Sequence, residues 1–411
     1  MTTHLPSLSG LRIEQRLKEL AAFTDVPGEM TRLTLSPAHK RAAGQVADWF
    51  GAAGMSAAID PAGSVIGRYE GARPGGKTLI IGSHIDTVRN AGIYDGNLGV
   101  ISGLAAVEAL HAQKRRLPFA VEICAFGDEE GVRFPTTLTG SRQRAGRFDM
   151  GALDEMDADG VSRRSALAEF GAPTKGLGEK LAGPASILAY LEVHIEQGPV
   201  LEARGLPAGI VTALNGVTRG DVMVRGMAGH AGTLPMAMRR DALATSAEMI
   251  LAIEREARAA PDLVATVGTL NVPGGAVNVV PGETRFSFDI RAPADGVRRA
   301  AVEAVRARIA EIARVRNVEA LFTPRYEAEA TPCDGVLYAG LARAMEKSGI
   351  TPFHLPSGAG HDVMSFRGLC PVAMLFVRCR GGISHNPAEY ASPDDIGTGA
   401  RLLYDWVMAM A

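Results

Sequence analysis

The sequence has no strong excess of charge of either sign. Its 43 basic and 45 acidic residues leave a formal net charge of −2 over 411 residues. Proteins that attract nucleic acid or an anionic membrane normally carry a basic excess, so this balance gives no reason to expect either partner. We therefore expect neither nucleic acid nor a membrane as a partner.

Long apolar runs and cysteine clusters are also missing. No stretch approaches the roughly 18 consecutive apolar residues of a membrane-spanning helix. Residues 1–23 lack the basic-then-apolar order of a secretory signal and are typical of an amphipathic helix. The four cysteines are scattered without a C-x-x-C pair, which disfavours disulfides and zinc-binding cysteines. We expect mostly buried thiols and a reducing compartment, the cytoplasm.

The first half of the chain alternates strand-like and helix-like segments. Short apolar runs at 77–86, 119–131 and 185–198 are typical of buried strands, and the last is expected to begin as a helix. Strands that alternate with helices predict an α/β domain with a mainly parallel sheet covered by helices. Ligands of such domains bind beyond the carboxyl ends of the strands. Each of the three runs ends in acidic or histidine-bearing residues, which is where a site is expected.

Residues 214–330 show a different order of expected helices and strands. The expected order of their elements is β-α-β-β-α-β, the order of the ferredoxin-like split βαβ fold. Because 411 residues exceed the usual size of one domain, we predict two. Residues 1–213 and 331–411 would form a catalytic domain, and 214–330 an α+β domain inserted into it. The tract 151–184 is rich in loops.

Four loops carry side chains that suit metal binding. The first contains His84, Asp86 and Asp95. Asp86 stands two residues after His84 in an extended chain, so we expect its carboxylate to hold the second ring nitrogen of that histidine. Asp95 can bridge two cations through its two oxygens. The other three loops are Asp-Glu-Glu-Gly at 128–131, His-Ile-Glu-Gln-Gly at 194–198 and Gly-Ile-Ser-His-Asn at 382–386.

Each of these residues has a simpler explanation when it is taken alone. A histidine at a strand end is often structural, the pair Glu129 and Glu130 is typical of a solvated loop, and Asp95 suits an ordinary turn. Together, three histidines and two or three carboxylates at strand ends make up the ligand set of a mixed nitrogen and oxygen site. Two cations that share a carboxylate and a water would generate hydroxide at neutral pH. From spacing alone, a dinuclear site and unconnected loops both remain open.

Several motifs resemble those of the M20 metallopeptidase clan in order and spacing. The resemblance runs from about residue 77 to 391. Within the clan, the motifs are most similar to those of the amidase, hydantoinase/carbamoylase branch. That branch contains N-carbamoyl-L-amino acid hydrolases, allantoate amidohydrolases and β-ureidopropionases. At position 194 the chain resembles this branch, because it has a histidine where peptidases of the clan commonly have an acidic metal ligand. The motifs are GSHIDTV, GIYDGNLGV, GDEEGVRF, LEVHIEQGPVLE, GHAGTLPM, NVVPG, DIRAP and GISHNPAE.

The resemblance implies two divalent cations per subunit. Zinc or manganese is expected, with cobalt and nickel as alternatives. Asp95 would bridge the pair, His84 and His194 would complete the first site, and Glu130 and His385 the second. The ligand set is complete in this sequence.

The resemblance also implies roles for residues outside the ligand set. Glu129 would be the general base that takes a proton from the water and delivers it to the leaving nitrogen. His230 would stabilise the developing oxyanion, reaching with Asn278 across a homodimer into the neighbouring site, so the inserted domain would serve as a lid and dimerisation domain. The implied substrate-binding residues are Gln197, Arg219, His230, Asn278, Arg291 and Gly360.

An arginine such as Arg291 offers two parallel hydrogen bonds to a carboxylate, which suits an acidic substrate. Its alternative role is a surface ion pair with Asp289 or Glu283. Many members of the branch carry a Gln-Arg-Arg run at the position where this chain has Val-Thr-Arg, so only Arg219 is kept. This departure concerns the choice of substrate rather than the metal chemistry.

The leading hypothesis is hydrolysis of an N-carbamoyl-L-amino acid to the amino acid, ammonia and carbon dioxide. Allantoate, ureidoglycolate or β-ureidopropionate is the alternative substrate for the same machinery. His194 disfavours a dipeptidase, and the complete ligand set disfavours a catalytically silent homologue. A serine hydrolase is disfavoured because no G-x-S-x-G motif is present.

Overall fold

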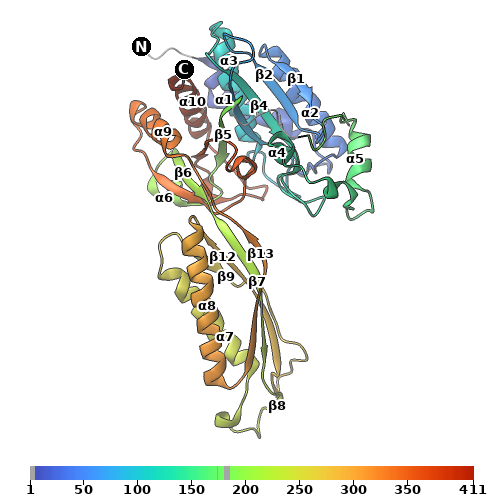
Figure 1. Ribbon diagram of the computed structural model, residues 1–411, viewed down its shortest axis with the longest axis vertical. Helices are drawn as coiled ribbons and strands as arrows, with labels where there is room; N and C mark the ends of the chain where they lie inside the picture. The colour runs from blue at the N-terminus through green and yellow to red at the C-terminus, as the bar shows by residue number, and fades with distance from the viewer. Residues whose placement is uncertain (1–4, 174, 180–185) are drawn as a thin grey trace. The chain divides into compact units, whose positions relative to one another are not determined.

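The chain divides into two units in the computed structural model, which describes residues 5–173, 175–179 and 186–411 (Figure 1). The first unit contains the residues up to Thr212 together with Cys333–Leu355 and Gly360–Ala411. The second contains Ala213–Pro332 and Pro356–Ala359. One continuous stretch of chain therefore forms most of the second unit. Its service as a lid or dimerisation domain stays a prediction.

Four parallel strands form the centre of the larger sheet. Their spatial order is β4 (Ala120–Phe126), β3 (Thr78–His84), β5 (Ile187–Ile195) and β16 (Val372–Val377). Nearly every residue in them is buried, as expected of parallel strands that are covered on both faces. The predicted parallel centre is confirmed. The helix expected at the start of 185–198 is wrong from Ile187 onward, and residue 185 lies outside the described residues.

Antiparallel strands flank this centre, which the sequence does not predict. On one side β4 pairs with β2 (Val65–Tyr69), which pairs with β1 (Ser56–Ile59). On the other side β16 pairs with β6 (Ala208–Leu214). Two short strands also pair with β6, namely β14 (Thr331–Pro332) and β15 (His354–Ser357).

Helices cover both faces of the parallel centre. α3 (Asn97–Ala112) packs over Ile81 of β3. The short helix η5 (Asp362–Phe366) stacks its last residue on Tyr190, with ring centroids 4.1 Å apart. Tyr190 is in register with Ile80, and neighbouring residues of a strand point to opposite faces, so α3 and η5 lie on opposite sides.

The remaining helices of the first unit complete these layers. α1 and α10 pack against each other and against α3, and α2 packs against β1 and β2. Capping side chains mark where several of them begin, as with Ser36 before α2, Asp334 before α9 and Ser392 before α10. The bounds are α1 Gly10–Ala21, α2 Pro37–Ala52, α4 Thr139–Arg144, α5 Arg163–Phe170, α6 Val200–Arg204, α9 Gly335–Lys347 and α10 Pro393–Ala409.

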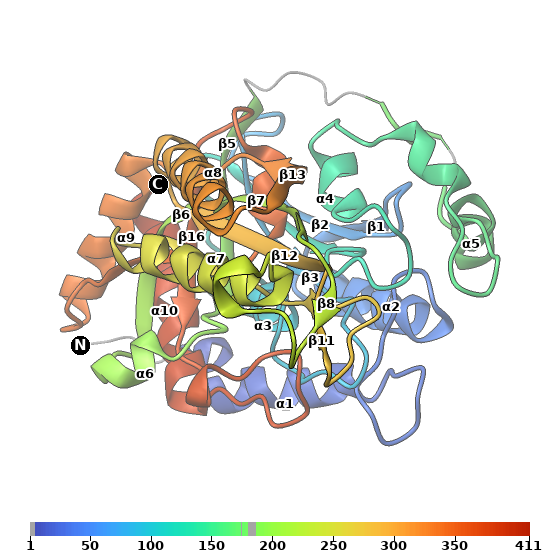
Figure 2. The ribbon, with the colours of Figure 1, turned by 90° about the horizontal axis from the view of Figure 1, so that it is seen from below.

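The second unit is an antiparallel sheet with two helices on one face. α7 (Ala242–Arg258) and α8 (Asp295–Arg316) lie side by side (Figure 2). Apolar residues of β7 and β12, such as Val222 and Phe286, form a buried core with them. The opposite face of these strands carries charged residues, as alternation along a strand requires. The strand order is β10 (Leu270–Asn271), β12 (Glu283–Ala292), β7 (Gly216–Arg225) and β13 (Glu319–Ala328), with β9 (Val264–Thr266) also paired to β12.

Two expectations drawn from composition can be compared with the structure. The helix predicted near the N-terminus is present as α1, while residues 1–4 lie outside the described part of the chain. All four cysteines are free thiols, and Cys124, Cys333 and Cys379 are buried, so the prediction of mostly buried thiols is confirmed. Within the described residues, no helix combines the length and the apolar character that crossing a membrane requires.

Candidate metal centre

The ends of the central strands bring the predicted metal ligands together. His84 is the last residue of β3, and His194 is the last but one of β5. Glu130 follows β4, His385 follows β16, and Asp95 lies just before α3. Because the four strands are parallel neighbours, their carboxyl ends meet at one edge of the sheet.

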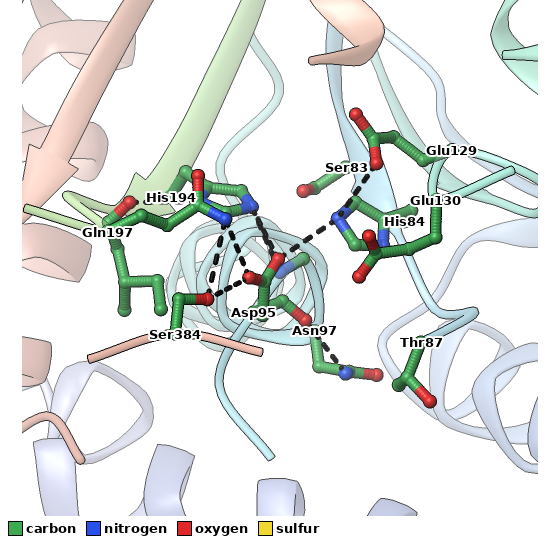
Figure 3. Close-up of polar contacts among 12 residues, drawn as sticks. Ser83, His84, Thr87, Asp95, Asn97, Glu129, Glu130, His194, Gln197 and Ser384 are labelled. Carbon is green, nitrogen blue, oxygen red and sulfur yellow. Dashed lines mark hydrogen bonds and ion pairs between the residues drawn. The ribbon is translucent and has the colours of Figure 1, made fainter. Parts of the chain in front are cut away.

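The first group of candidate ligands consists of His84, Asp95 and His194. Oδ1 of Asp95 lies 3.3 Å from Nε2 of His84 and 3.0 Å from Nε2 of His194 (Figure 3). All three side chains are buried. Their ligand atoms lie within 4.8 Å of one another, so one cation can contact all three.

Both histidines present the ring nitrogen that a cation needs. Nδ1 of His84 lies 3.0 Å from the backbone carbonyl oxygen of Asp86, and Nδ1 of His194 lies 2.9 Å from that of Ile195. A carbonyl oxygen only accepts hydrogen bonds, so each Nδ1 carries the proton and each Nε2 keeps its lone pair. The backbone N–H of Gly96 donates to Nε2 of His194 at 3.1 Å, which agrees with this tautomer.

The expected hydrogen bond between the Asp86 carboxylate and His84 is wrong, because the backbone carbonyl oxygen of Asp86 takes that place. Oδ1 of Asp86 lies 3.8 Å from Nδ1 of His84, farther than the backbone carbonyl oxygen. The two carboxylate oxygens instead accept hydrogen bonds from the backbone N–H groups of Glu129 and Glu130, at 3.2 and 3.3 Å. Asp86 therefore holds the acidic loop after β4 beside the histidine loop after β3.

The second group consists of Asp95, Glu130 and His385. Nε2 of His385 lies 3.5 Å from Oδ2 of Asp95 and 3.3 Å from Oε2 of Glu130. Oδ1 of Asp95 thus faces the two histidines of the first group, and Oδ2 faces His385 of the second. The His385 side chain is 48% exposed, whereas the two carboxylates are almost enclosed. The backbone of His385 has φ of 54°, in the left-handed region that few non-glycine residues adopt, so its loop must hold it there.

Glu129 lies beside the first group without belonging to it. Its Oε2 is 3.9 Å from Nε2 of His84, and its side chain is 11% exposed. Burial raises the pKa of Glu129 well above its usual value, even though His84 opposes this effect. Burial also raises the pKa of Glu130 to about 8. Burial therefore disfavours the ionised form of both carboxyl groups.

This donor set fits divalent cations. Imidazole nitrogens and carboxylate oxygens together suit zinc and other first-row metals. Oε1 of Glu130 is buried and has no hydrogen-bond partner among the described residues. A buried carboxylate oxygen without a donor is costly unless a positive charge compensates it. A cation between Glu130 and His385 would supply that charge.

Gly96 allows Asp95 to approach His84. Its φ is 65°, a conformation that favours glycine. A Cβ at this position would lie 2.4 Å from atoms of the His84 ring. Any other residue would therefore displace the histidine, so the turn between Asp95 and α3 requires glycine.

Two predicted substrate-binding residues lie in the first unit. Nε2 of Gln197 donates to Oδ2 of Asp95 at 2.7 Å, and its own backbone has φ of 57° (Figure 3). Gly360 precedes His361, whose ring centroid lies 4.5 Å from that of His194. Gln197 and Gly360 therefore border the candidate ligands.

Arg219 and Arg291 of the second unit share one carboxylate. Arg291 donates two parallel hydrogen bonds to Asp289, at 2.7 and 2.8 Å, and Arg219 donates one at 2.8 Å. Burial alone would raise the pKa of Asp289, but the hydrogen bonds from the two arginines outweigh it and lower the pKa. The ion pair between Arg291 and Asp289 is one of the two that the sequence analysis gives as an alternative role for this arginine. The three side chains line a depression of about 650 Å³ on the charged face of the sheet.

His230 and Asn278 lie next to each other in the second unit. β8 (Gly229–His230) pairs with β11 (Val279–Val280), and the backbone N–H of Ala231 donates to the Asn278 carbonyl at 3.0 Å (Figure 2). Both side chains are exposed. Nδ1 of His230 accepts a hydrogen bond from the backbone N–H of Gly232 at 3.1 Å. The proton of the neutral ring is therefore on Nε2, which suits a donor to an oxyanion.

Comparison with known proteins identifies the family. The profile of peptidase family M20/M25/M40 matches residues 80–409. The chain belongs to this family. It is 39% identical to the N-carbamoyl-L-amino acid amidohydrolase of Geobacillus stearothermophilus, over 98% of this chain and 99% of that protein. It is also 39% identical to a probable allantoate deiminase of Oryza sativa subsp. japonica, over 95% of this chain and 87% of that protein.

The amidase branch of the M20 family provides the structural match as well. The crystal structure of a hydantoinase/carbamoylase family amidase from Burkholderia ambifaria superposes with a TM-score of 0.91 at 35% identity, covering 98% of each chain. The resemblance to this branch is therefore confirmed. Membership of a metal-dependent family agrees with the two groups of candidate ligands, each of which can hold an ion.

One buried arginine, Arg32, was missed in the sequence analysis, and it holds the loops that carry the candidate ligands. Arg32 is fully buried, and its Nε donates to the carbonyl oxygen of Ile85 at 2.6 Å. Its Nη2 donates to Oδ1 of Asn97 at 2.6 Å, and Nδ2 of Asn97 donates to the carbonyl oxygen of Asp95 at 3.0 Å. The Asp95 loop thus depends on a residue that precedes it in the chain by one helix, α2, and three strands, β1 to β3.

A second buried arginine, Arg163 of α5, was also missed. It pairs with the carboxylate of Asp128, whose backbone has φ of 70°, and donates to Oγ1 of Thr139 at 3.0 Å. Asp128 directly precedes Glu129. An isolated arginine in a loop-rich tract is typical of the surface, so a single sequence offers no signal for this role.

Proposed function

We propose that this member of the M20 family is a two-cation amidohydrolase that cleaves the ureido C–N bond of an N-carbamoyl-L-amino acid. The observation that carries the proposal is the position of Asp95, whose two oxygens face two different sets of ligands. His84 and His194 would complete the first cation site. Glu130 and His385 would complete the second.

Two divalent cations, zinc or manganese with cobalt or nickel as alternatives, would polarise the ureido carbonyl and lower the pKa of a water molecule. Glu129 would take a proton from that water, and its position beside the first group, without belonging to it, supports this role. It then delivers the proton to the leaving nitrogen, since an amine leaves poorly unless it is protonated. The water oxygen bonds to the carbonyl carbon, so that the carbonyl oxygen becomes an oxyanion, and the C–N bond then breaks as the nitrogen is protonated. The products are the amino acid and carbamic acid, which decomposes to ammonia and carbon dioxide.

The substrate carboxylate would bind at Arg219 and Arg291. Asp289 holds Arg291 by both oxygens, and Nη1 of Arg291 donates to the carbonyl oxygen of Gly358 at 2.7 Å, so the guanidinium is already oriented. One carboxylate cannot neutralise two guanidinium groups. The remaining positive charge suits a second carboxylate, that of the substrate.

Four further residues would contact the substrate. Gln197 and Gly360, which border the candidate ligands, would contact its ureido group. His230 would donate from Nε2 to the developing oxyanion, and Asn278 would bind the substrate beside it. Both are exposed at the paired strands β8 and β11, and we propose that in a homodimer they serve the site of the neighbouring subunit. A cytoplasmic location would keep the four free thiols reduced.

Allantoate is the alternative substrate, since it too combines ureido groups with a carboxylate. The observation that favours keeping it is the equal similarity, 39%, of this chain to the carbamoylase and to the probable allantoate deiminase. Ureidoglycolate and β-ureidopropionate share the same chemistry. A dipeptidase remains less well supported because of His194.

The test supplies Mn²⁺ and measures ammonia release from ureido acids and amino acid release from dipeptides. The panel contains N-carbamoyl-L-amino acids, their D-enantiomers, allantoate and dipeptides. The highest kcat/KM is expected for an N-carbamoyl-L-amino acid. A clear preference for allantoate would select the alternative substrate. Hydrolysis of dipeptides alone, without ammonia from any ureido acid, would contradict the proposal.

A further inference from the structure

Glu389 lies between two of the loops that carry candidate metal ligands. Its Oε1 accepts hydrogen bonds from the backbone N–H groups of Tyr94 and Asp95, at 2.7 and 3.0 Å. Its Oε2 lies 3.2 Å from Oγ of Ser384. Asp95 and His385, the residue after Ser384, both belong to the second group of ligands. One side chain therefore contacts both loops of that group.

The Glu389 side chain occupies a narrow slot. It is only 5% exposed. Gly92 closes one side of the slot, because a Cβ on Gly92 would lie 2.3 Å from Cβ and 2.4 Å from Cδ and Oε1 of Glu389. A buried carboxylate with three directed contacts and a glycine against it has little freedom to move. The groups that it contacts are therefore held at a defined separation.

Ser384 links Glu389 to the shared carboxylate as well. Its Oγ is within hydrogen-bond distance of Oδ2 of Asp95 (Figure 3). The same Oγ lies 3.2 Å from Oε2 of Glu389. The next residue, His385, has the left-handed backbone noted above, which its loop must maintain against its intrinsic preference. The contact between Glu389 and Ser384 lies directly before this strained position.

We propose that Glu389 is a positioning residue that sets the separation between Asp95 and His385 and so shapes the second cation site. The inference rests on the proposed function, since it concerns a ligand group of that function. Glu389 acts through the backbone of Tyr94 and Asp95 and through Ser384. Loss of such a supporting partner typically weakens metal binding about 10- to 100-fold.

Two substitutions of Glu389 separate position from charge. Glu389→Gln keeps an acceptor oxygen for the two backbone N–H groups, and its amide can donate to Oγ of Ser384. Glu389→Ala leaves both N–H groups without this acceptor. Gly92→Ala leaves Glu389 intact but forces it out of the slot. A matched structural control is Asp395→Ala, because Asp395 is also buried and binds Arg378 by two hydrogen bonds of 3.0 and 2.8 Å.

The experiment titrates Mn²⁺ into metal-stripped protein, followed by calorimetry and by electron paramagnetic resonance. Wild type and Glu389→Gln are expected to bind two ions that give the signal of a coupled pair. Glu389→Ala and Gly92→Ala should bind the first ion normally and the second about 10- to 100-fold more weakly, with the signal of an isolated ion. Asp395→Ala should lower the melting temperature of the metal-free protein and leave the second ion unaffected.

The inference is overturned if Glu389→Ala binds the second ion as tightly as wild type, or if Asp395→Ala weakens that ion equally. If Glu389→Ala does not fold, Gly92→Ala decides in the same way. Wild-type protein that binds fewer than two ions would contradict the proposed function itself, and the inference with it. The two failures are therefore distinguished by the wild-type titration.

Discussion

Oδ1 of Asp95 lies 3.0 Å from Nε2 of His194. The two residues reach this point from different elements, one from the loop before α3 and the other from the end of β5. The other oxygen of Asp95 faces His385, at 3.5 Å. A carboxylate whose oxygens face separate histidines is the geometric basis for two neighbouring cations.

Glu129 and Glu130 are expected to fail in different ways when each is changed to glutamine. Glu129→Gln should keep its metal and lose about 100-fold or more in kcat, because the amide cannot take a proton from water. Glu130→Gln should lose metal, because Oε2 of Glu130 lies 3.3 Å from Nε2 of His385. Elemental analysis and ammonia release on the same samples separate the two effects. A normal rate in Glu129→Gln would reject the base, and full metal content in Glu130→Gln would reject the ligand.

Arg291→Ala is expected to raise KM about 10- to 100-fold, with a smaller effect on kcat. The reason is that a hydrogen bond to a charged group contributes about 1.5–3 kcal/mol, and the lost partner would be the substrate carboxylate. Arg285→Ala is the control, because Arg285 lies on the same strand and pairs with Glu283 outside the depression. Steady-state kinetics on an N-carbamoyl amino acid measure both variants. An unchanged KM in Arg291→Ala would show that its pair with Asp289 is purely structural.

His230→Ala is expected to lower kcat about 100- to 1000-fold, the usual cost of losing one donor to an oxyanion. Mixing this variant with Glu129→Gln subunits should restore activity if His230 serves the neighbouring site. Half of the dimers would be mixed, each with one intact site, so about a quarter of wild-type activity should return. Glu129→Gln mixed with Glu130→Gln is the control and should stay inactive. Absence of recovery after subunit exchange would argue against a site shared between subunits.

Asp60 gives a prediction for stability, away from the metal centre. Burial raises the pKa of Asp60 to about 7, although the backbone N–H groups of Ala62 and Ser64 donate to it. A group whose pKa is higher in the folded state stabilises the fold below its unfolded pKa of about 4, and this stabilisation is lost as pH rises through about 7. Asp60→Asn keeps an acceptor and cannot ionise. Its melting temperature should therefore fall less between pH 6 and 9 than that of wild type, as scanning calorimetry can measure. Equal falls would contradict the shifted pKa.

The position of the candidate ligands was largely predictable from the sequence. His84, His194 and His385 each follow an apolar run, and parallel strands bring such endings to one edge of the sheet. The glycine-rich loop around Asp95 pointed to the same place. No side-chain geometry was needed for this inference, because the strand direction alone brings these residues together.

The residues that hold the ligands in place could not be predicted in the same way. Spacing places Asp86 on the same side as His84 but cannot decide whether its carboxylate or its carbonyl oxygen meets the ring, and the carbonyl does. Arg32 and Glu389 act on loops far away in the sequence, and a lone charged residue is typical of the surface. Their burial depends on the tertiary path of the chain, which no local pattern reports.

The most direct test of the central claim is ammonia release from an N-carbamoyl-L-amino acid by metal-stripped protein, before and after Mn²⁺ is added back. The expected result is no turnover without metal, recovery in wild type, and no recovery in Asp95→Ala, because that variant lacks the oxygens shared by the two ligand groups. Undiminished turnover by the stripped protein would contradict the account, as would full recovery in Asp95→Ala.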